Sequence, residues 1–203
     1  MKAFFKHHDW QRLRRYLLLF ARNPIEKIKH VPQFDWPHLI FFIGGLAAIS
    51  ISLNGIVGQY FNFNMILAVL LFPVSSIVVS FILSGFFYYT FLFFLDRKID
   101  FKCLVTVILF STIPYYVFEI VEPAFQIARI VGLLFSSVLL IVGLVENFKL
   151  NKKFVIRLVG AAVVTYFVLW GLAVINENQS RIQQKDIEKY HLDQLEREVK
   201  EFR

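Results

Sequence analysis

Apolar residues in this chain form long runs separated by short charged turns, and they do not alternate with polar residues as in a half-buried strand. The central part, residues 103–145, holds two such runs with Glu122 and Pro123 between them. Each run is about as long as one bilayer crossing requires, roughly 17–25 residues. Only helices and closed barrels satisfy their backbone groups in lipid, and a barrel needs alternating strands. The pattern therefore predicts a helical hairpin in a membrane.

Three further apolar runs extend this hairpin to an all-α, polytopic membrane bundle with five transmembrane helices. We expect the crossings at about 38–57, 73–95, 103–121, 127–145 and 154–175, within one membrane domain of residues 37–175. The run 62–95 is too long for one crossing, so we expect Pro73 to divide it, with residues 65–72 lying shallow or re-entering. Pro114 should bend the third crossing, because it removes one backbone hydrogen bond.

A basic amphipathic segment, residues 1–36, precedes the first crossing. Apolar residues recur at helical spacing from Trp10 over residues 10–21, and arginines crowd the other side. This pattern suits an interfacial helix in the headgroup layer of an anionic leaflet, and equally an amphipathic helix packed on its own transmembrane bundle. The residues expected at the membrane surface are Trp10, Arg12, Arg14, Arg15 and the interfacial anchor Trp36.

Residues 176–203 form a separate polar segment after the last crossing. A capping-box pattern at Ser180 and the spacing of Leu192, Leu195, Val199 and Phe202 predict an extramembrane C-terminal helix. Its apolar seam covers barely two heptads, too few for a coiled coil alone. It could dock on a partner, on the membrane surface or on a second copy, or remain solvated.

Composition and charge agree with a membrane protein. The chain has 203 residues, of which 57% are hydrophobic, above the roughly 45–50% of ordinary soluble domains. Its net charge of +7 could suggest nucleic-acid binding. The basic residues gather in the N-terminal segment and in the turns 96–102 and 146–153, which is a topology signal. We therefore expect an integral membrane protein with a cytoplasmic N-terminus, the C-terminus on the opposite side, and no nucleic-acid partner.

The sequence contains no recognisable catalytic or cofactor-binding motif. It has no Gly-rich phosphate loop, no H-E-x-x-H, no G-x-S-x-G and no group of residues at metal-ligand spacing. Its single cysteine, Cys103, cannot form an intrachain disulfide. We expect no enzymatic activity, no cofactor and no metal.

Ionisable residues in and beside the central hairpin are the first functional candidates, because an unpaired charge in lipid is costly. Glu119 and Arg129 lie equally far from the turn, so an antiparallel hairpin should pair them. Glu119 with Glu122 could form a proton or cation site; alternatively Glu119 and Arg129 close the hairpin and Glu122 caps it in water. Across the next turn, Glu146 and Arg157 are similarly placed and should pair.

A serine stripe is the second candidate. Ser76, Ser80 and Ser84 recur every four residues in the second crossing, on one side of a helix. Such a stripe could line a polar path through the bilayer. It could equally serve helix packing, with each hydroxyl bonded to the preceding turn.

Three motifs resemble the Yip1 domain family. They are the charged turn with Phe101 followed by Phe110-x-x-x-Pro114, where Phe110 replaces a usual tyrosine; Gly143-Leu-x-Glu146 before a basic turn; and Asn23-Pro24 ahead of the first helix. The resemblance covers roughly residues 22–175 and implies five membrane helices with a cytoplasmic N-terminus. Eukaryotic members act in vesicle traffic with small GTPases and with one another. This chain lacks their Asp-Leu-Tyr-Gly-Pro signature, which suits the bacterial branch and a bacterial inner membrane.

Two functional hypotheses follow. The first is a non-enzymatic membrane protein that organises or shapes the bilayer through membrane-protein partners or self-association, with anionic lipids at its N-terminal helix. The alternative is a transporter or channel subunit that moves a small ion or lipid past the serine stripe and the Glu119–Arg129 region. Charge-neutral substitution of Glu119 separates the two.

Overall fold

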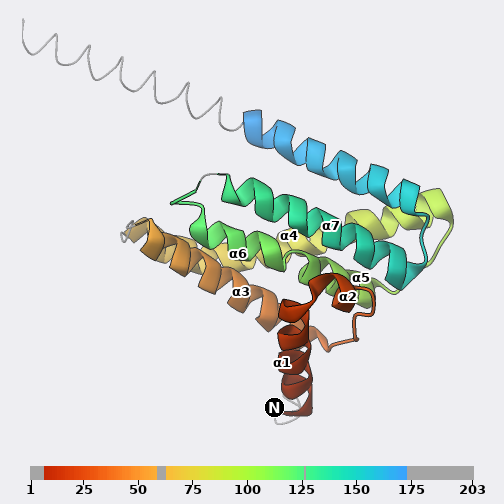
Figure 1. Ribbon diagram of the computed structural model, residues 1–203, viewed down its shortest axis with the longest axis horizontal. Coiled ribbons are helices and arrows are strands. Elements are labelled where there is room, and N and C mark those ends of the chain that lie inside the picture. Colours follow the sequence, from red (N-terminus) through yellow and green to blue (C-terminus); the bar gives the residue numbers. More distant parts are fainter. Residues whose placement is uncertain (1–6, 59–62, 126, 173–203) are drawn as a thin grey trace, which may run out of the picture. The chain divides into compact units, whose positions relative to one another are not determined.

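The computed structural model describes residues 7–58, 63–125 and 127–172. Within these ranges the regular secondary structure is helical, which confirms the all-α prediction. The chain divides into two compact units, residues 1–159 and 160–203. The labelled helices are α1 (His7–Arg22), α2 (Pro24–Ile28), α3 (Trp36–Val57), α4 (Phe63–Leu95), α5 (Phe101–Ser111), α6 (Ile113–Val121) and α7 (Ala128–Phe148) (Figure 1).

Five of the described helical segments are long and apolar enough to cross a membrane, which confirms the predicted number. They are Trp36–Val57, Ile66–Leu95, Phe101–Val121, Ala128–Phe148 and a last, unlabelled helix, Lys152–Leu172. Their mean hydropathies lie between 1.9 and 2.7, as expected of segments whose side chains face lipid rather than water. The chain is therefore an integral membrane protein.

The second crossing differs from the prediction at Pro73. The structure has a continuous helix of 33 residues, α4, with Pro73 inside it, so residues 65–72 are helical and not a separate re-entrant piece. Proline removes one N–H donor, but membrane helices tolerate this loss where neighbouring groups compensate. The hydroxyl of Ser75 donates to the carbonyl of Phe72 (2.9 Å) beside the proline.

We expect Pro114 to bend the third crossing, and the structure interrupts the helix just before this residue. Helix α5 ends at Ser111, Thr112 stands between, and α6 begins with Pro114 in its first turn. Proline suits that position, since the first N–H groups of a helix have no intrahelical acceptor. The hydroxyls of Ser111 and Thr112 donate to the carbonyls of Val107 (2.7 Å) and Leu109 (2.9 Å) around the break.

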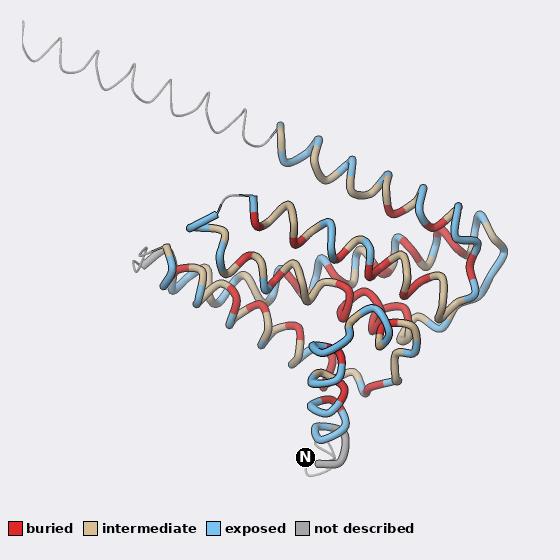
Figure 2. Tube along the Cα trace, viewed as in Figure 1, coloured by how far each residue is buried: buried red, intermediate tan, exposed pale blue. Residues whose placement is uncertain are grey.

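The core of the first unit lies where α1 and the linker to α3 meet α5. Phe110 is fully buried and contacts four aromatic rings, with centroid distances of 4.8 to 5.8 Å. These rings belong to Tyr16, Phe20, Phe34 and Phe42. Figure 2 shows the buried positions concentrated along α5 and the inner side of α1. The apolar side of α1 is thus used for packing on the protein.

Two glycines allow α7 to approach its neighbours closely. A Cβ at Gly132 would lie 2.7 Å from the Cβ of Phe118 and 3.2 Å from the backbone of Tyr115 in α6. A Cβ at Gly143 would lie 2.7 Å from Val107 of α5 and 3.0 Å from Ile28 of α2. Small residues at these positions let helices pack by van der Waals contact inside lipid, where the hydrophobic effect between helices is absent.

In the second unit, the structure describes the continuation of the last helix to Leu172. Val164, Val168 and Leu169 on this stretch are all more than half exposed, as a lipid-facing helix would leave them. The predicted helix in residues 176–203 lies outside the described residues.

Candidate functional site

A buried polar cluster joins α3 to α6 inside the membrane-spanning part. The side chain of Glu119 is only 4% exposed, and its Oε2 accepts a hydrogen bond from the Ser50 hydroxyl at 3.3 Å. The same hydroxyl donates to the carbonyl of Tyr116 at 2.8 Å. The side-chain amide of Asn54 donates to the carbonyl of Glu119 at 2.6 Å. Ser50 and Asn54, four residues apart, therefore hold one side of α3 against α6.

The turn between α6 and α7 carries an ion pair. The Arg129 guanidinium lies 3.5 Å from Glu122 Oε1, donates from Nε to the Tyr115 hydroxyl at 3.1 Å, and stacks over that ring at 5.8 Å. We predicted Glu119 as the partner of Arg129; the ion pair that the structure shows is with Glu122. The Glu119 carboxylate also accepts a hydrogen bond from Ser50 of α3, a partner that lies outside the hairpin.

The serine stripe of α4 lies on its packed side. Ser76, Ser80 and Ser84 are at most 8% exposed and lie on the same side of the helix as the buried rings of Phe87 and Phe91. Ser80 and Ser84 each donate to the carbonyl four residues earlier at 2.7 Å. This is the geometry of the packing alternative, in which serines allow close contact and satisfy their hydroxyls within the helix.

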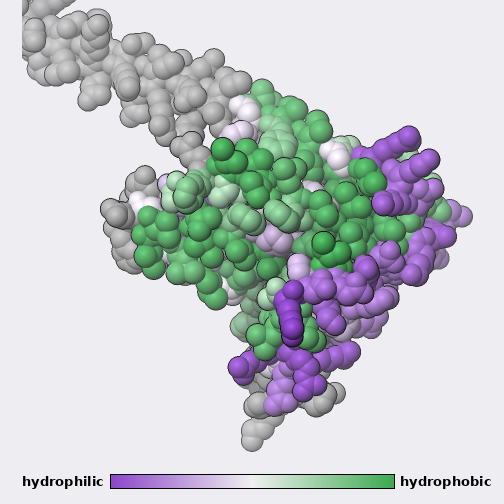
Figure 3. Space-filling model, viewed as in Figure 1, coloured by the Kyte–Doolittle hydropathy of each residue, from purple (hydrophilic) through white to green (hydrophobic). Residues whose placement is uncertain are grey.

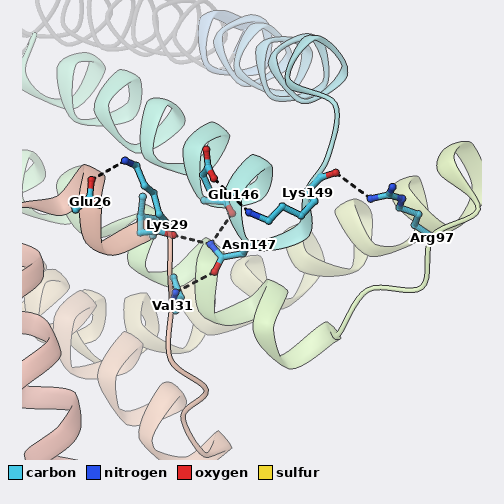
Figure 4. A network of polar contacts seen from close by, with 9 residues as sticks. Glu26, Lys29, Val31, Arg97, Glu146, Asn147 and Lys149 are labelled. Atoms are coloured by element: carbon cyan, nitrogen blue, oxygen red, sulfur yellow. Dashed lines mark hydrogen bonds and ion pairs between the residues drawn. The ribbon is translucent and has the colours of Figure 1, made fainter.

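At the opposite end, Asn147 near the end of α7 fixes the N-terminal segment. Its side-chain amide donates to the carbonyl of Ile28 at 2.7 Å, and its oxygen accepts the backbone N–H of Val31 at 3.1 Å (Figure 4). The amide also donates to the carbonyl of Gly143. One side chain thus satisfies backbone groups of a segment more than 100 residues away in the sequence.

Further polar contacts close this end, which we call the basic end: α1, α2 and the turns 96–100 and 149–153. Arg97 donates to the carbonyls of Phe148 (3.3 Å) and Lys149 (3.1 Å), where a cation also opposes the negative end of the α7 dipole. Lys102 pairs with Asp35 at 3.2 Å. Glu146 lies 3.8 Å from Lys149, not paired with Arg157 as predicted; Arg157 is exposed. Figure 3 shows the hydrophilic surface gathered at this end.

Helix α1 lies across the direction of α3, α6 and α7 at this end (Figure 1). It begins at His7, three residues before the predicted start. The side chains of Arg12, Arg14 and Arg15 are exposed, and Trp10 is 37% exposed. The structure has the packed arrangement, because the opposite side of α1 is buried in the aromatic core. Its arginines remain available to a membrane surface.

Two aromatic residues of this region, Trp36 and Tyr16, make contacts between elements. Trp36, which we expect to be an interfacial anchor, stacks on Phe81 at 5.6 Å and contacts Phe101. The Tyr16 hydroxyl donates to the carbonyl of Lys27 at 2.8 Å, which links α1 to α2. Burial raises the pKa of Tyr16 well above its ordinary value.

Sequence reasoning missed three polar residues that make long-range contacts: Ser50, Asn54 and Asn147. A signal was present for the first two, because two polar residues four apart in an apolar helix mark one side for contact. Asn147 follows the Gly-Leu-x-Glu motif directly, but nothing local identifies Ile28 and Val31 as its partners.

The comparisons with known proteins give a family. The sequence matches the family model of the Yip1 domain over residues 17–175, which is more than half of the chain. No curated protein and no solved structure matches it. The chain belongs to the Yip1 domain family. The matched region begins inside α1 and runs through all five apolar helices, so it includes both polar clusters.

Proposed function

We propose that this chain is a non-enzymatic membrane protein that organises or shapes the bilayer through protein partners, with its basic end toward the cytoplasm. The observation that carries the proposal is the fixed position of α1. Its buried side is held by the aromatic core and its far end by the contacts of Asn147 and Tyr16 with the adjoining segment. A basic helix is thereby presented at a set angle to the membrane spans.

The outer side of α1 supports contact with an anionic leaflet. Three exposed arginines, Arg12, Arg14 and Arg15, share this side with Leu18 and Leu19, whose exposed fractions are 66% and 42%. Each basic residue near an anionic surface contributes about 1 kcal/mol to binding, and exposed leucines can enter the headgroup layer. A rigidly attached helix of this kind transmits its insertion to the bundle, which is how it could bend or organise the bilayer.

The polar groups inside the spans favour this proposal over transport. Ser50, Asn54, Ser80 and Ser84 all donate to backbone carbonyls of the bundle. Ser50 and Asn54 join two helices, and Ser80 and Ser84 are satisfied within α4. Hydroxyl and amide groups used in these ways are poorly suited to exchange partners with a passing ion. The alternative, a transporter or channel subunit, keeps support from one observation, the carboxyl group of Glu119 buried within a span.

Reconstitution tests the first proposal. Purified protein in liposomes that contain anionic lipid should change vesicle shape, seen by electron microscopy, and the triple variant R12Q/R14Q/R15Q should not. The matched control K152Q/K153Q/R157Q removes the same charge outside α1, and it should retain the effect. Equal loss in both variants would mean that net charge acts, and not the helix.

Ion flux tests the alternative. Proteoliposomes with the wild type, E119Q or the control E122Q should show the same ion or lipid flux as empty liposomes. Flux that appears with the wild type and disappears in E119Q, while the variant remains folded in detergent, would overturn the scaffold proposal in favour of transport.

A further inference from the structure

A cavity of about 500 Å³ opens at the basic end, between the α4–α5 turn and the end of α7. This size is within the range of small-molecule sites, roughly 300–1,000 Å³. Its charged lining residues are Asp96, Arg97, Lys98 and Asp100, and Ile99 and Phe148 add apolar surface. Two acidic and two basic side chains give the lining a formal charge of zero, which does not suit a simple anion or a simple cation.

Two of these four charges are used by the protein itself. The Asp100 carboxylate accepts the N–H of Lys102 at 2.9 Å at the start of α5 and the Gln33 side-chain amide at 2.9 Å. Arg97 Nη1 donates to the two carbonyls at the end of α7. Among the described residues, no hydrogen bond or ion pair engages the Asp96 carboxylate or the Lys98 ammonium group. The cavity therefore offers one uncommitted anion and one uncommitted cation.

The backbone conformation of Asp96 ends α4 beside the cavity. Asp96 has φ = 50°, the left-handed conformation that closes α4, with the N–H of Arg97 donating to the carbonyl of Phe91 at 3.3 Å. Glycine is the residue that adopts this conformation without steric cost at a helix end. An aspartate in its place supplies a carboxylate at the cavity that helix termination does not require.

The position of the cavity indicates a lipid as the ligand. It lies where three spans end, at the depth at which phospholipid headgroups begin. Phe93 and Phe94, on the last turn of α4, are 78% and 76% exposed. Acyl chains could lie along this apolar surface while a headgroup occupies the cavity.

We propose that this cavity binds the headgroup of a zwitterionic phospholipid with a primary ammonium group, of the phosphatidylethanolamine type. Lys98 holds the phosphate, together with those N–H groups of Arg97 that do not donate to the carbonyls at the end of α7. The ammonium group of the lipid donates to the Asp96 carboxylate. A primary ammonium has three N–H donors for a carboxylate, whereas a choline headgroup has none. This site is separate from α1, and the proposal does not depend on the proposed function.

Native mass spectrometry of the purified full chain tests the proposal, with ethanolamine, choline and glycerol phospholipids that carry identical acyl chains. The ethanolamine lipid should bind about tenfold more tightly than the other two, the effect of one charged hydrogen bond. D96N should remove this preference, and K98Q should weaken the binding of both the ethanolamine and the glycerol lipid. The control K153Q, in the neighbouring basic turn, should change nothing.

A second variant separates binding from folding. D96G should unfold at the same temperature as the wild type or higher, because glycine suits the left-handed position, and yet lose the ethanolamine preference. The proposal would be overturned if the wild type bound the three lipids equally or bound the glycerol lipid more tightly. It would also be overturned if D96N or D96G kept the preference for the ethanolamine lipid. Soluble glycerophosphoethanolamine should compete poorly; if it bound as tightly as the lipid, the site would bind the headgroup chemistry but not a membrane lipid.

Discussion

The two ends of the first unit are held together by different means. Toward the basic end, the Phe110 ring of α5 lies among four aromatic rings, two of which belong to α1. Within the spans, α3 and α6 are joined by Ser50 and Asn54 through hydrogen bonds to carbonyl and carboxylate oxygens. Apolar burial gains free energy only where water is displaced, whereas lipid is as apolar as leucine. The aromatic core therefore gains free energy from the burial of α1 against the bundle, while directional polar contacts join α3 to α6 inside the spans.

The largest effect is expected at the aromatic core. Phe110→Ala should destabilise the protein by about 3–5 kcal/mol, because it leaves a cavity under α1. Equilibrium unfolding in mixed micelles, followed by circular dichroism, measures this loss. Phe93→Ala, a change at a 78% exposed ring, is the control and should cost far less.

Asn147→Ala should cost about 1–3 kcal/mol, because it leaves the carbonyl of Ile28 and the N–H of Val31 without their partner. The same change should raise the rate of proteolysis in residues 29–35. Glu146→Gln is the neighbouring control, since its long, exposed pair with Lys149 contributes little. An intact linker in Asn147→Ala would mean that packing alone fixes the segment.

His38 lies between the aromatic core and the polar contacts of the spans. Its replacement should raise the free energy of unfolding, whereas the other substitutions lower it. Its ring is 2% exposed, contacts Trp10 at 5.0 Å, and has no hydrogen-bond partner on either nitrogen among the described residues. His38→Phe should therefore stabilise the protein by about 1–3 kcal/mol, by removing unsatisfied buried nitrogens. A lower midpoint in the unfolding experiment would show that the imidazole is satisfied in the membrane.

Within the spans, Ser50→Ala should cost about 0.6 kcal/mol and at most about 1.7 kcal/mol, the average and the maximum measured for polar contacts between membrane helices. Ser52→Ala is the matched control, because its hydroxyl bonds only to the preceding turn, at the carbonyl of Ala48. If Ser50→Ala cost as much as Phe110→Ala, the distinction between the two regions would not hold.

The smallest effect depends on pH. Tyr16→Phe should cost about 0.5–1.5 kcal/mol at neutral pH through the lost bond to the Lys27 carbonyl. Burial raises the pKa of Tyr16, so the folded state favours the neutral phenol. This contribution is fully present below the ordinary pKa of about 10 and declines as the pH rises above it. The stability difference between wild type and variant should shrink above about pH 10; a constant difference would contradict it.

The sequence predicted what depends on the length and apolarity of single segments. The number of crossings follows from the apolar runs between charged turns. The irregularity of the third crossing near Pro114 follows from the backbone N–H that proline lacks. The prediction at Pro73 was wrong, because it considered the backbone N–H that proline lacks but not the neighbouring groups of the helix that compensate for it. The partners of Glu119 and Asn147 were beyond reach, since they lie 69 and 119 residues away. Such contacts depend on which helices become neighbours, which apolar runs do not encode individually.

The unbroken α4 has a mechanical consequence for the surrounding lipid. Its apolar part, Ile66–Leu95, is 30 residues long. At about 1.5 Å per residue it measures about 45 Å, against a hydrocarbon thickness of about 30 Å. Such a rod must tilt strongly or force the bilayer to thicken beside it. Insertion of this protein should therefore be less favourable in thin membranes than in thicker ones.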